Sequence, residues 1–507
     1  MTESRVDHRR STTRWIVLAI AVVALHAIWS LSIPLMASPD EPSHVVRAAA
    51  VARGQWAGEM GPPPTDGSRP GTGTIVQLPS EYAQLVALPN CFAYQPEQPA
   101  SCQQDVPPSD QSSIPVETFA GQYPPLYYAL VGWPSLVTDG EASVYAMRLV
   151  SGVLAAALLV WGVFRLLRSA RPGPAVWASA VAITPMVLFM GATVNPQALE
   201  ISSAFAFWAA CVALATSTGR PSTAVVVQAT VTGVVLVNSR ASGPIWALAA
   251  VVIAVLLAPR GRLRELWAAR SIRLAGLAAI VSGILAVVWV VTHGGVVTAQ
   301  ALFPEYTEPF ATARQVARLS PAYVRQAIGD FGWLDAPSPP LTVAIWVVAG
   351  ALMLVMALVC RAPRRGRLAL GLLTVGVAAA PFALQIPTAP DAGLVWQGRY
   401  VLPLAVGLPI VAANVLTAGR QRRTRTIARW VLVAVAGAQV AAFYWASRRY
   451  SEGLDGALFT VAPDWSSPLG YLSAVALYTG VWCVVGVLGW RATADVATEP
   501  RQPAPLG

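Results

Sequence analysis

The chain has 507 residues, of which 55% are hydrophobic and only 12% charged, and its mean hydropathy is +0.54. A soluble protein carries about 25% charged residues, so the composition excludes a chain of soluble domains. Repeated apolar runs of about 17–25 residues are typical of transmembrane helices. The sequence therefore predicts an all-α polytopic membrane protein.

All 35 basic residues are arginine, and the formal net charge of +10 would suit nucleic acid if these residues formed one patch. Instead they gather in the N-terminal tail and in every second loop, in the sequences RLLRSARPG, PRGRLRELWAARSIR, RAPRRGR and GRQRRTRTIAR. Cytoplasmic loops carry such an arginine excess. We therefore interpret the charge as a topology signal that also binds anionic membrane lipids, and expect no nucleic acid partner.

Twelve transmembrane segments are predicted, with both chain termini in the cytoplasm. Residues 1–14 are expected to form a basic tail, residues 15–490 the transmembrane domain, and residues 491–507 a disordered tail. The predicted spans lie near residues 15–36, 142–168, 174–192, 199–217, 223–238, 242–258, 274–292, 341–360, 368–386, 400–418, 430–446 and 469–490.

Two segments admit another interpretation. YPPLYYALVGWPSLV (123–137) is apolar enough for a further span, but the acidic TDGEAS that follows is unsuited to a cytoplasmic loop. Its prolines suit a short interfacial helix, so we expect a juxtamembrane helix on the outer face. The first apolar run also resembles a signal peptide with a weak cleavage sequence, MAS, although a retained span agrees better with the later topology.

Two large segments, residues 37–141 and 293–340, are expected outside the membrane. The first contains Cys91 and Cys102, eleven positions apart in a proline-rich sequence. Exported cysteines at such a spacing predict a disulfide, with two free thiols as the alternative. Residues 58–74 (GEMGPPPTDGSRPGTGT) are of low complexity and are expected to be mobile.

Asp40 and Glu41, in SPDEPSH directly after the first apolar segment, are the main candidates for chemistry. Two adjacent carboxylates at a membrane surface cost desolvation energy. Capping of a helix over residues 40–54 would explain one acid but not both. In such a helix Asp40, His44 and Arg47 would share a face.

Arg240 in NSRASGP and Arg399 in WQGRYVLP lie at the predicted outer ends of spans. Arginine at this depth is costly unless it pairs with an anion, and a lipid phosphate matches its fork of donors. The alternative is a structural pair with an acid such as Asp391 or Glu200. Glu200 and Asn195, in TVNPQALE, begin a span, where an acid in the first turn also favours the helix dipole.

The second outer segment contains Arg314, Arg318 and Arg325 at roughly helical spacing, which predicts an interfacial helix. FGWLD then places Trp333 and Asp335 in a turn before the next span. Aromatic residues at a membrane interface usually form belts, but the same rings also stack on sugars.

Six motifs occur in one order: SPDEPSHVVRAAAVARGQ, QYPPLYYALVGWP, AMRLVSGVLAA, TPMVLFMGATVNPQALE, FGWLDAPSPP and QGRYVLPL. As a set they resemble the bacterial membrane proteins grouped as domain of unknown function 2142, from about residue 37 to 465. The layout is similar to that of the GT-C superfamily of glycosyltransferases. Those integral membrane enzymes carry an acidic motif in a large first outer loop and take sugars from polyprenyl-phosphate donors.

The resemblance implies a GT-C-like fold in the cytoplasmic membrane and a glycosyltransferase that moves a sugar to a cell-envelope glycan, lipid or protein. Asp40 or Glu41 occupies the place of the acidic motif, and Arg148 lies near the start of the second span. We expect a single inverting displacement with Asp40 as first choice of base, and Glu41 either orienting Asp40 or holding His44. Arg399 and Arg240 are expected to bind the donor phosphate.

Further substrate-binding residues are expected among the polar and aromatic groups of the outer segments. They are His44, Arg47, Tyr123, Asn195, Glu200, Trp333, Asp335, Gln397 and Tyr400. Because no second acidic pair lies near Asp40, no metal ligands are assigned, and a requirement for Mg²⁺ or Mn²⁺ stays open. The alternatives are a transporter or flippase of lipid-linked sugars, which would carry ionisable residues deep in its spans, or a non-catalytic envelope-assembly protein.

Overall fold

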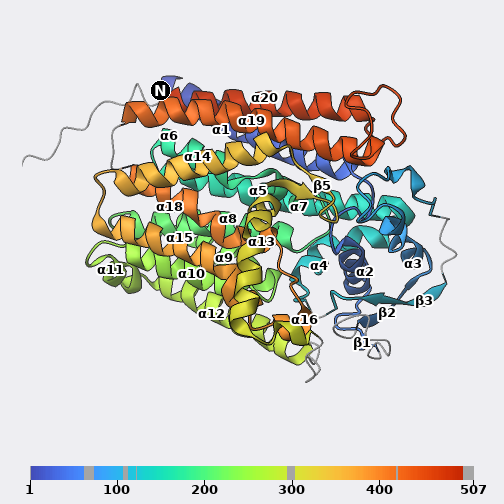
Figure 1. Cartoon of the computed structure of the whole chain (residues 1–507). Helices are drawn as coiled ribbons and strands as arrows, with labels where there is room; N and C mark the ends of the chain where they lie inside the picture. The colour runs from blue at the N-terminus through green and yellow to red at the C-terminus, as the bar shows by residue number, and fades with distance from the viewer. Residues whose placement is uncertain are drawn as a thin grey trace, which may run out of the picture.

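The computed structural model describes residues 2–61, 73–106, 112–121, 123–293, 303–417 and 421–494 (Figure 1). Its long helices run in roughly one direction and form a bundle. One end of the bundle carries α2 (Glu41–Ala52) and a small sheet, and we call it the loop end. The other end carries α11 (Arg262–Ala268), the start of α1 and the end of α20, and we call it the arginine-rich end.

The bundle is made of helices that run between these two ends. They are α1 (Thr2–Ser32), α5 (Gly140–Ser169), α6 (Pro172–Ala182), α7 (Pro185–Gly191), α8 (Gln197–Thr216), α9 (Thr223–Ser239), α10 (Gly243–Leu257), α12 (Arg270–His293), α14 (Pro340–Val359), α15 (Arg364–Gln385), α17 (Leu402–Ala405), α18 (Gly407–Leu416), α19 (Gln421–Glu452) and α20 (Tyr471–Ala494). The helices α6 and α7 form one bent pair, and α17 and α18 lie within one candidate span.

Shorter elements cover the loop end. They are β1 (Glu59–Met60), β2 (Thr74–Pro79), α3 (Glu81–Leu85), η1 (Leu88–Cys91), η2 (Ala100–Cys102), β3 (Ser113–Thr118), α4 (Leu126–Val131), η3 (Trp133–Leu136), η4 (Pro304–Tyr306), α13 (Pro309–Gly329), β4 (Asp330–Phe331), β5 (Ala336–Pro337), α16 (Ala389–Ala392) and η5 (Gly398–Val401).

Nine helices within the described residues are long and apolar enough to cross a membrane. A tenth span arises if α6 and α7, bent by 63° at a break before Pro185, count as one. The remaining two predicted spans correspond to α9 and α10, which have 17 and 15 residues. These are shorter than the roughly 20 residues that a span needs. The chain is a multi-pass membrane protein with nine or ten candidate spans among the described residues, and the prediction of twelve spans is not confirmed.

Several predicted boundaries differ from the observed ones. Because α1 begins at Thr2, the expected basic tail continues the first helix, and α20 extends to Ala494 into the expected C-terminal tail. Residues 495–507 lie outside the described residues, as do residues 62–72 of the segment expected to be mobile. The segment 123–137 forms two short helices, α4 and η3, where one short helix was predicted.

The central helix of the bundle is α8. Its apolar window is 89% buried, against 6% for α12, which leaves most of α12 facing outward. Small residues in FAFWAACVALA let α5, α9 and α18 approach α8 closely, as in other membrane bundles. Trp208 on α8 is fully buried, and its Nε1 donates to the Pro403 carbonyl at 3.0 Å.

At the loop end, β1, β2 and β3 form an antiparallel sheet in that order. Alternate residues Thr74, Val76 and Leu78 of β2 are buried, so one face of the strand packs on α2. Thr118 at the end of β3 donates to the Ser43 carbonyl at 2.7 Å and fixes the start of α2. This packing positions the turn between α1 and α2.

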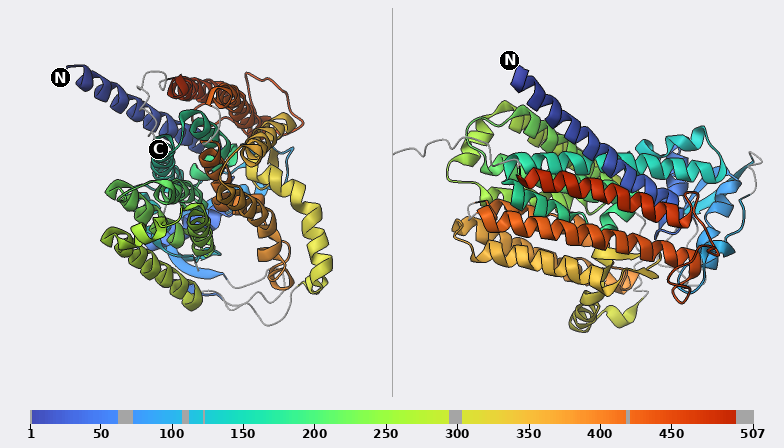
Figure 2. Two further views of the ribbon diagram at one scale, coloured as in Figure 1. Left: turned by 90° about the vertical axis from the view of Figure 1, so that its left-hand side faces the viewer. Right: turned by 90° about the horizontal axis from the view of Figure 1, so that it is seen from above.

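The helix α13 lies across the bundle at the loop end instead of along it (Figures 1 and 2). Arg314, Arg318 and Arg325 are exposed, as expected of an interfacial helix, whereas Tyr323 and Ile328 are buried. The pair β4–β5 follows and returns the chain to the bundle at α14.

Candidate functional site

Asp40 lies in the turn between α1 and α2. It occupies the N-cap position of α2 but makes no side-chain cap hydrogen bond, and its φ is 64°. The side chain is 51% exposed, and Oδ2 lies 2.8 Å from Nη2 of Arg399. The left-handed backbone therefore turns the carboxylate away from α2 and toward η5. The capping interpretation of Asp40 is not supported.

Arg399 is 3% exposed, and its Nε has no hydrogen-bond partner among the described residues. Its position depends on Gly398, where an added Cβ would lie 1.8 Å from the Tyr323 carbonyl oxygen of α13. The Gly398 amide also donates to Gln326 Oε1 at 2.8 Å. Only glycine allows this close approach, which brings the Arg399 guanidinium to Asp40.

Arg240 converges on the same place from the end of α9. The guanidinium carbons of Arg240 and Arg399 lie 4.9 and 5.2 Å from the centroid of the Tyr400 ring. Arg240 Nη1 lies 3.6 Å from Glu200 Oε2, while Arg399 pairs with Asp40. Each guanidinium already faces a carboxylate, so an anion such as a phosphate would bind here by sharing or replacing those partners.

Glu200 is fully buried one turn inside α8. Its Oε1 accepts from Ser242 Oγ at 2.6 Å and from Trp246 Nε1 at 3.1 Å. These bonds hold the turn between α9 and α10, and with it Arg240, at the loop end. Glu200 therefore positions Arg240, which agrees with the structural alternative for this acid.

Glu41 is fully buried, and both of its carboxylate oxygens accept hydrogen bonds. Its two carboxylate oxygens accept from Nε and Nη2 of Arg148 at 2.7 and 2.6 Å, and Oε1 also accepts from the Val194 amide at 3.0 Å. Arg148 is equally buried. Its remaining donors reach the carbonyls of Ser30, Ile33 and Pro34. The pair ties the end of α1 to α5, and Glu41 does not reach the space beside Asp40.

Asp40 precedes the helix in a left-handed conformation, so Asp40, His44 and Arg47 do not form one face of α2. His44 still lies close enough to Asp40, Arg240 and Arg399 for their charges to influence its pKa, and its ring is 5.6 Å from that of Tyr123. His44 Nδ1 lies 2.9 Å from Tyr128 Oη, and burial lowers the pKa of His44 to about 3, so the ring is neutral. Arg47 Nη2 donates to the Trp56 carbonyl at 2.5 Å. Tyr123 Oη accepts from Arg240 Nη2 at 3.4 Å and is the residue of this group that borders the arginines.

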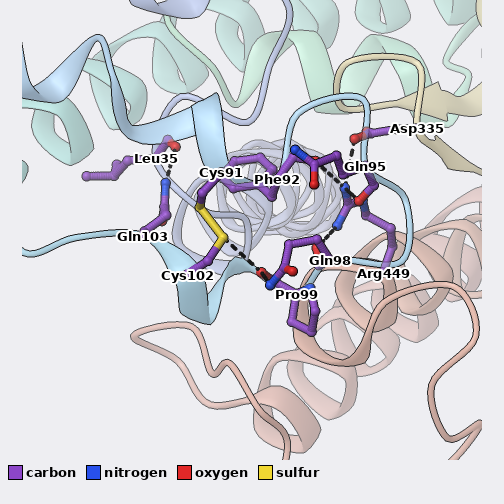
Figure 3. Close-up of a disulfide and its surroundings, with 10 residues drawn as sticks. All are labelled: Leu35, Cys91, Phe92, Gln95, Gln98, Pro99, Cys102, Gln103, Asp335 and Arg449. Carbon is purple, nitrogen blue, oxygen red and sulfur yellow. Dashed lines mark hydrogen bonds and ion pairs between the residues drawn. A yellow bond between two sulfur atoms is a disulfide. The ribbon is translucent and has the colours of Figure 1, made fainter.

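Asp335 and Arg449 hold the segments 37–141 and 293–340 to each other (Figure 3). Asp335 Oδ2 lies 2.8 Å from Arg449 Nη2 at the end of α19. Arg449 also donates to the carbonyls of Phe92, Gln95 and Gln98. Those carbonyls lie between Cys91 and Cys102, which form a disulfide. Asp335 is therefore engaged in structure, not open to a ligand.

Trp333 and Tyr94 border the Asp40 turn from two different loops. Trp333 Nε1 donates to the Met36 carbonyl at 3.1 Å, and the Tyr94 and Trp333 rings are 5.6 Å apart. Met36, Asp40, Tyr94 and Leu334 are the non-glycine residues with positive φ in the described part of the chain. Strained backbone gathers at functional sites, and here all four residues surround one location.

Asp330 is a further acid next to this location. It lines a narrow crevice with Pro39, Gln326, Gln397 and Arg399, which has no room for a water molecule. Within the described residues, Asp330 Oδ1 and Gln397 Oε1 have no hydrogen-bond partner. Burial raises the pKa of Asp330 to about 6, with Arg325 opposing that shift and Asp335 adding to it.

Asn195 braces the turn that carries Asp40. Its Nδ2 donates to the Pro39 carbonyl at 3.4 Å, and its Oδ1 accepts from the Gln197 amide at 3.0 Å. Gln197 in turn donates to the Arg399 carbonyl at 3.4 Å. The side chains of TVNPQALE therefore hold both members of the Asp40–Arg399 pair in place.

An apolar groove of about 670 Å³ lies beside the pair, between α6, α13, α14, α15 and α18. Its lining residues Trp396, Val401 and Leu402 flank Gln397 and Arg399 in the sequence, and Tyr323 and Ala327 flank Gln326. The groove and the charged residues thus share the walls formed by α13 and residues 396–402. No group of three or more His, Cys, Asp or Glu side chains suited to a metal ion occurs within the described residues.

A family model described as "Predicted membrane protein (DUF2142)" matches residues 23–408, about three quarters of the chain. The chain belongs to the DUF2142 family. Among solved structures, it is similar to ArnT from Cupriavidus metallidurans, in a crystal structure bound to undecaprenyl phosphate. The identity is 15% and the TM-score 0.42, over 95% of this chain and 78% of that chain. Comparison with curated proteins gives no match.

The structure thus brings together the predicted site residues Asp40, Arg399, Arg240, Tyr400 and Gln397, with Tyr123 and Trp333 at the edges. The others serve as supports around them: Glu41, His44, Arg47, Asn195, Glu200 and Asp335. Sequence reasoning missed Asp330 and Tyr94. In the sequence, Asp330 is an acid directly before FGWLD, and Tyr94 is a tyrosine between two cysteines. Neither pattern distinguishes the residue, and only the folded structure shows that both lie near the Asp40 turn.

Proposed function

We propose that the protein is a membrane glycosyltransferase that moves a sugar from a polyprenyl-phosphate donor to a cell-envelope acceptor. The observation that carries the proposal is the Asp40–Arg399 pair, a half-exposed carboxylate 2.8 Å from a buried guanidinium. The pair combines a base with a cation for a phosphate leaving group. Its position in the loop after the first span is the one that the GT-C resemblance implies.

The basic residues support a phosphorylated substrate. Arg399 is buried and its Nε is unpaired among the described residues, so it has donors left for a second anion. Arg240, 16% exposed, approaches the same ring of Tyr400. Guanidinium forks bind phosphate oxygens in a bidentate way, which a lone ammonium does not reproduce.

The apolar groove supports a lipid carrier. It is lined by hydrophobic side chains of α13, α14, α15 and α18, and its lining includes Trp396 and Val401, which flank Gln397 and Arg399 in the sequence. A polyprenyl chain in this groove would leave its phosphate between Arg399 and Arg240 and its sugar near Asp40. Trp333 and Tyr94 then offer ring faces to the sugar or to the acceptor.

In the proposed reaction, the acceptor hydroxyl transfers its proton to Asp40 while its oxygen forms a bond to the anomeric carbon. The bond between that carbon and the phosphate oxygen breaks, and polyprenyl phosphate leaves with the electron pair. Arg399 and Arg240 stabilise the charge that develops on the phosphate. Because Asp40 and the phosphate compete for Arg399, donor binding releases Asp40 from its ion pair and frees it to act as base.

The arginine-rich end is assigned to the cytoplasm, because loops with an arginine excess stay on that side. The Asp40–Arg399 pair then faces the outer side, and both chain ends lie in the cytoplasm. In a bacterial cell this membrane is the cytoplasmic membrane.

The test is transfer of radiolabelled sugar from a panel of polyprenyl-phosphate donors to envelope acceptors, in membranes with equal amounts of each variant. Asp40→Asn is expected to lower transfer by about 10²–10⁴-fold, the usual contribution of a general base. Asp139→Asn is the matched control, since Asp139 is also an N-cap residue at the loop end without a side-chain cap bond. Loss of transfer in both variants would contradict a specific role for Asp40.

A binding assay separates the donor site from the chemistry. Arg399→Gln is expected to weaken binding of polyprenyl phosphate to the purified protein, whereas Asp40→Asn retains or tightens it by removing the competing carboxylate. No transfer by the wild type across the panel, together with movement of the lipid-linked sugar between leaflets, would favour a flippase. Equal transfer by wild type and Asp40→Asn would remove Asp40 from the mechanism.

A further inference from the structure

A second large cavity opens at the opposite end of the bundle, far from the site described above. It has a volume of about 850 Å³, within the range of about 300–1,000 Å³ of small-molecule sites. Its walls belong to α1, α5, α6 and α20. In Figure 2, α1 crosses α20 at an angle, and its N-terminal end leans away from the bundle on this side.

The cavity is polar at one end and apolar along its length. Arg14, Arg168 and Arg171 line it, from the arginine-rich end of α1, α5 and the α5–α6 turn. Ser169 and Thr417 add hydroxyl groups close to the arginines. Three arginines and no Asp or Glu occur among the lining residues that the structure describes, so guanidinium groups are the charged groups of this lining.

The apolar wall has the depth of one membrane leaflet. On α1 the lining residues extend from Arg14 to Leu25, which is about 16 Å at 1.5 Å per residue. On α5 they extend from Leu159 to Arg168, about 14 Å by the same rise. Half of a hydrocarbon core of about 30 Å is about 15 Å. A lipid with an acyl chain of leaflet length and an anionic headgroup would match these dimensions and the arginines of the lining.

We propose that this cavity is a binding site for an anionic phospholipid of the leaflet at the arginine-rich end. The headgroup phosphate lies among Arg14, Arg168 and Arg171, and an acyl chain follows the wall formed by α1, α5 and α20. The arginines of this cavity thus bind one lipid in a defined place, beyond the general attraction of a basic surface to anionic lipids. The site is independent of the proposed transfer reaction.

The test measures lipid binding to the purified full chain in detergent, by native mass spectrometry and by thermal unfolding. Phosphatidylglycerol and phosphatidylcholine with identical acyl chains are compared, together with inorganic phosphate. Phosphatidylglycerol is expected to bind and raise the melting temperature, whereas phosphatidylcholine binds at least 10-fold more weakly. Equal binding of both lipids, or equal stabilisation by phosphate alone, would overturn the proposal.

The triple variant Arg14→Gln, Arg168→Gln, Arg171→Gln is expected to weaken phosphatidylglycerol binding about 100-fold. This corresponds to roughly 1 kcal/mol for each arginine near a membrane surface. The matched control replaces the same number of exposed arginines at the same end of the bundle but outside the cavity, namely Arg260, Arg264 and Arg270. An equal loss in the control would mean unspecific attraction.

Leu18→Trp tests the apolar part of the cavity. It retains every charged residue and places a larger side chain where the acyl chain is proposed to lie. It is expected to weaken lipid binding at least 10-fold and to leave the weak effect of phosphate unchanged. The other candidate occupant of the cavity is a segment of the chain itself, residues 495–507. A variant that ends at residue 494 tests this alternative. Binding of phosphatidylglycerol that appears only in this shortened chain would overturn the proposal.

Discussion

The buried Glu41–Arg148 pair separates structure from chemistry at the acidic motif. Glu41→Gln removes the negative charge but keeps the shape of the side chain. The Arg148 guanidinium then stays buried without a counter-charge, and its acceptors are three backbone carbonyls and the amide oxygen of the introduced glutamine. Removing one member of a buried ion pair lowers the free energy of unfolding by about 3–5 kcal/mol. Because Arg148 keeps its hydrogen bonds to carbonyls, we expect a loss of about 3 kcal/mol for this variant.

Arg148→Met is expected to cost more. It leaves the Glu41 carboxylate with a single donor, the Val194 amide, and removes the donors from three carbonyls. An unsatisfied buried group costs about 1–3 kcal/mol, so we expect about 5 kcal/mol or more. The double variant Glu41→Leu, Arg148→Met leaves no buried charge, and its cost should be smaller than the sum of the two single changes.

The assay is thermal unfolding of purified protein in one detergent, with sugar transfer measured on the same preparations. At roughly 2 °C per kcal/mol for a large domain, the expected falls in melting temperature are about 6 °C for Glu41→Gln and about 10 °C for Arg148→Met. Glu141→Gln, an exposed acid at the start of α5, is the control and should melt like the wild type. Glu41→Gln that melts like the wild type but has lost all transfer would refute the structural role.

Three further outcomes follow from single features of the loop end. Because the pKa of Asp330 is raised from 3.8 to about 6, the folded state keeps a proton that the unfolded state releases, and the carboxylate lowers stability by up to about 3 kcal/mol as pH rises from about 4 to about 6. Asp330→Asn should therefore melt higher than the wild type at pH 7.5 and equally near pH 4, whereas an equal difference at both pH values would contradict this. Gly398→Ala forces η5 away from α13, so it should lower the free energy of unfolding by about 1–3 kcal/mol and abolish most of the sugar transfer. Gly371→Ala, with open space around the added methyl group, should leave both stability and transfer unchanged. Replacing Cys91 and Cys102 by Ala should cost about 2–3 kcal/mol and abolish the effect of a reductant on the melting temperature; a reductant effect that persists would point to another thiol.

The sequence singled out several of the residues that meet at the loop end, because isolated charges in an apolar chain are conspicuous. Asp40 and Arg399 were each recognised from their place at the end of a span, but their pairing depends on a contact between distant segments. The choice between Asp40 and Glu41 depends on one dihedral angle, the positive φ of Asp40, which composition and spacing do not reveal. Likewise, the partner of Glu41 is Arg148, from a motif recognised only as the start of a span.

The number of spans was less predictable for a physical reason. Hydropathy counts apolar residues but does not measure where a helix ends. The segments at α9 and α10 are apolar enough, yet Ser239 and Leu257 end them at 17 and 15 residues. Asp330 escaped notice because a single acid in a loop is ordinary, and only its burial beside Gln397 and Arg399 distinguishes it.

The pairing of Asp40 with Arg399 also bears on the order in which the protein is made. The two residues are 359 positions apart, and Arg449 is 357 positions from the Phe92 carbonyl that it holds. At a synthesis rate of about 5–20 residues per second, the first outer segment waits roughly 20–70 s for these partners. The disulfide, with a separation of 11, can close during that interval. The nascent protein can therefore have its disulfide closed before its site exists, and a chain that stops just before residue 399 contains Arg240 but lacks the partner of Asp40.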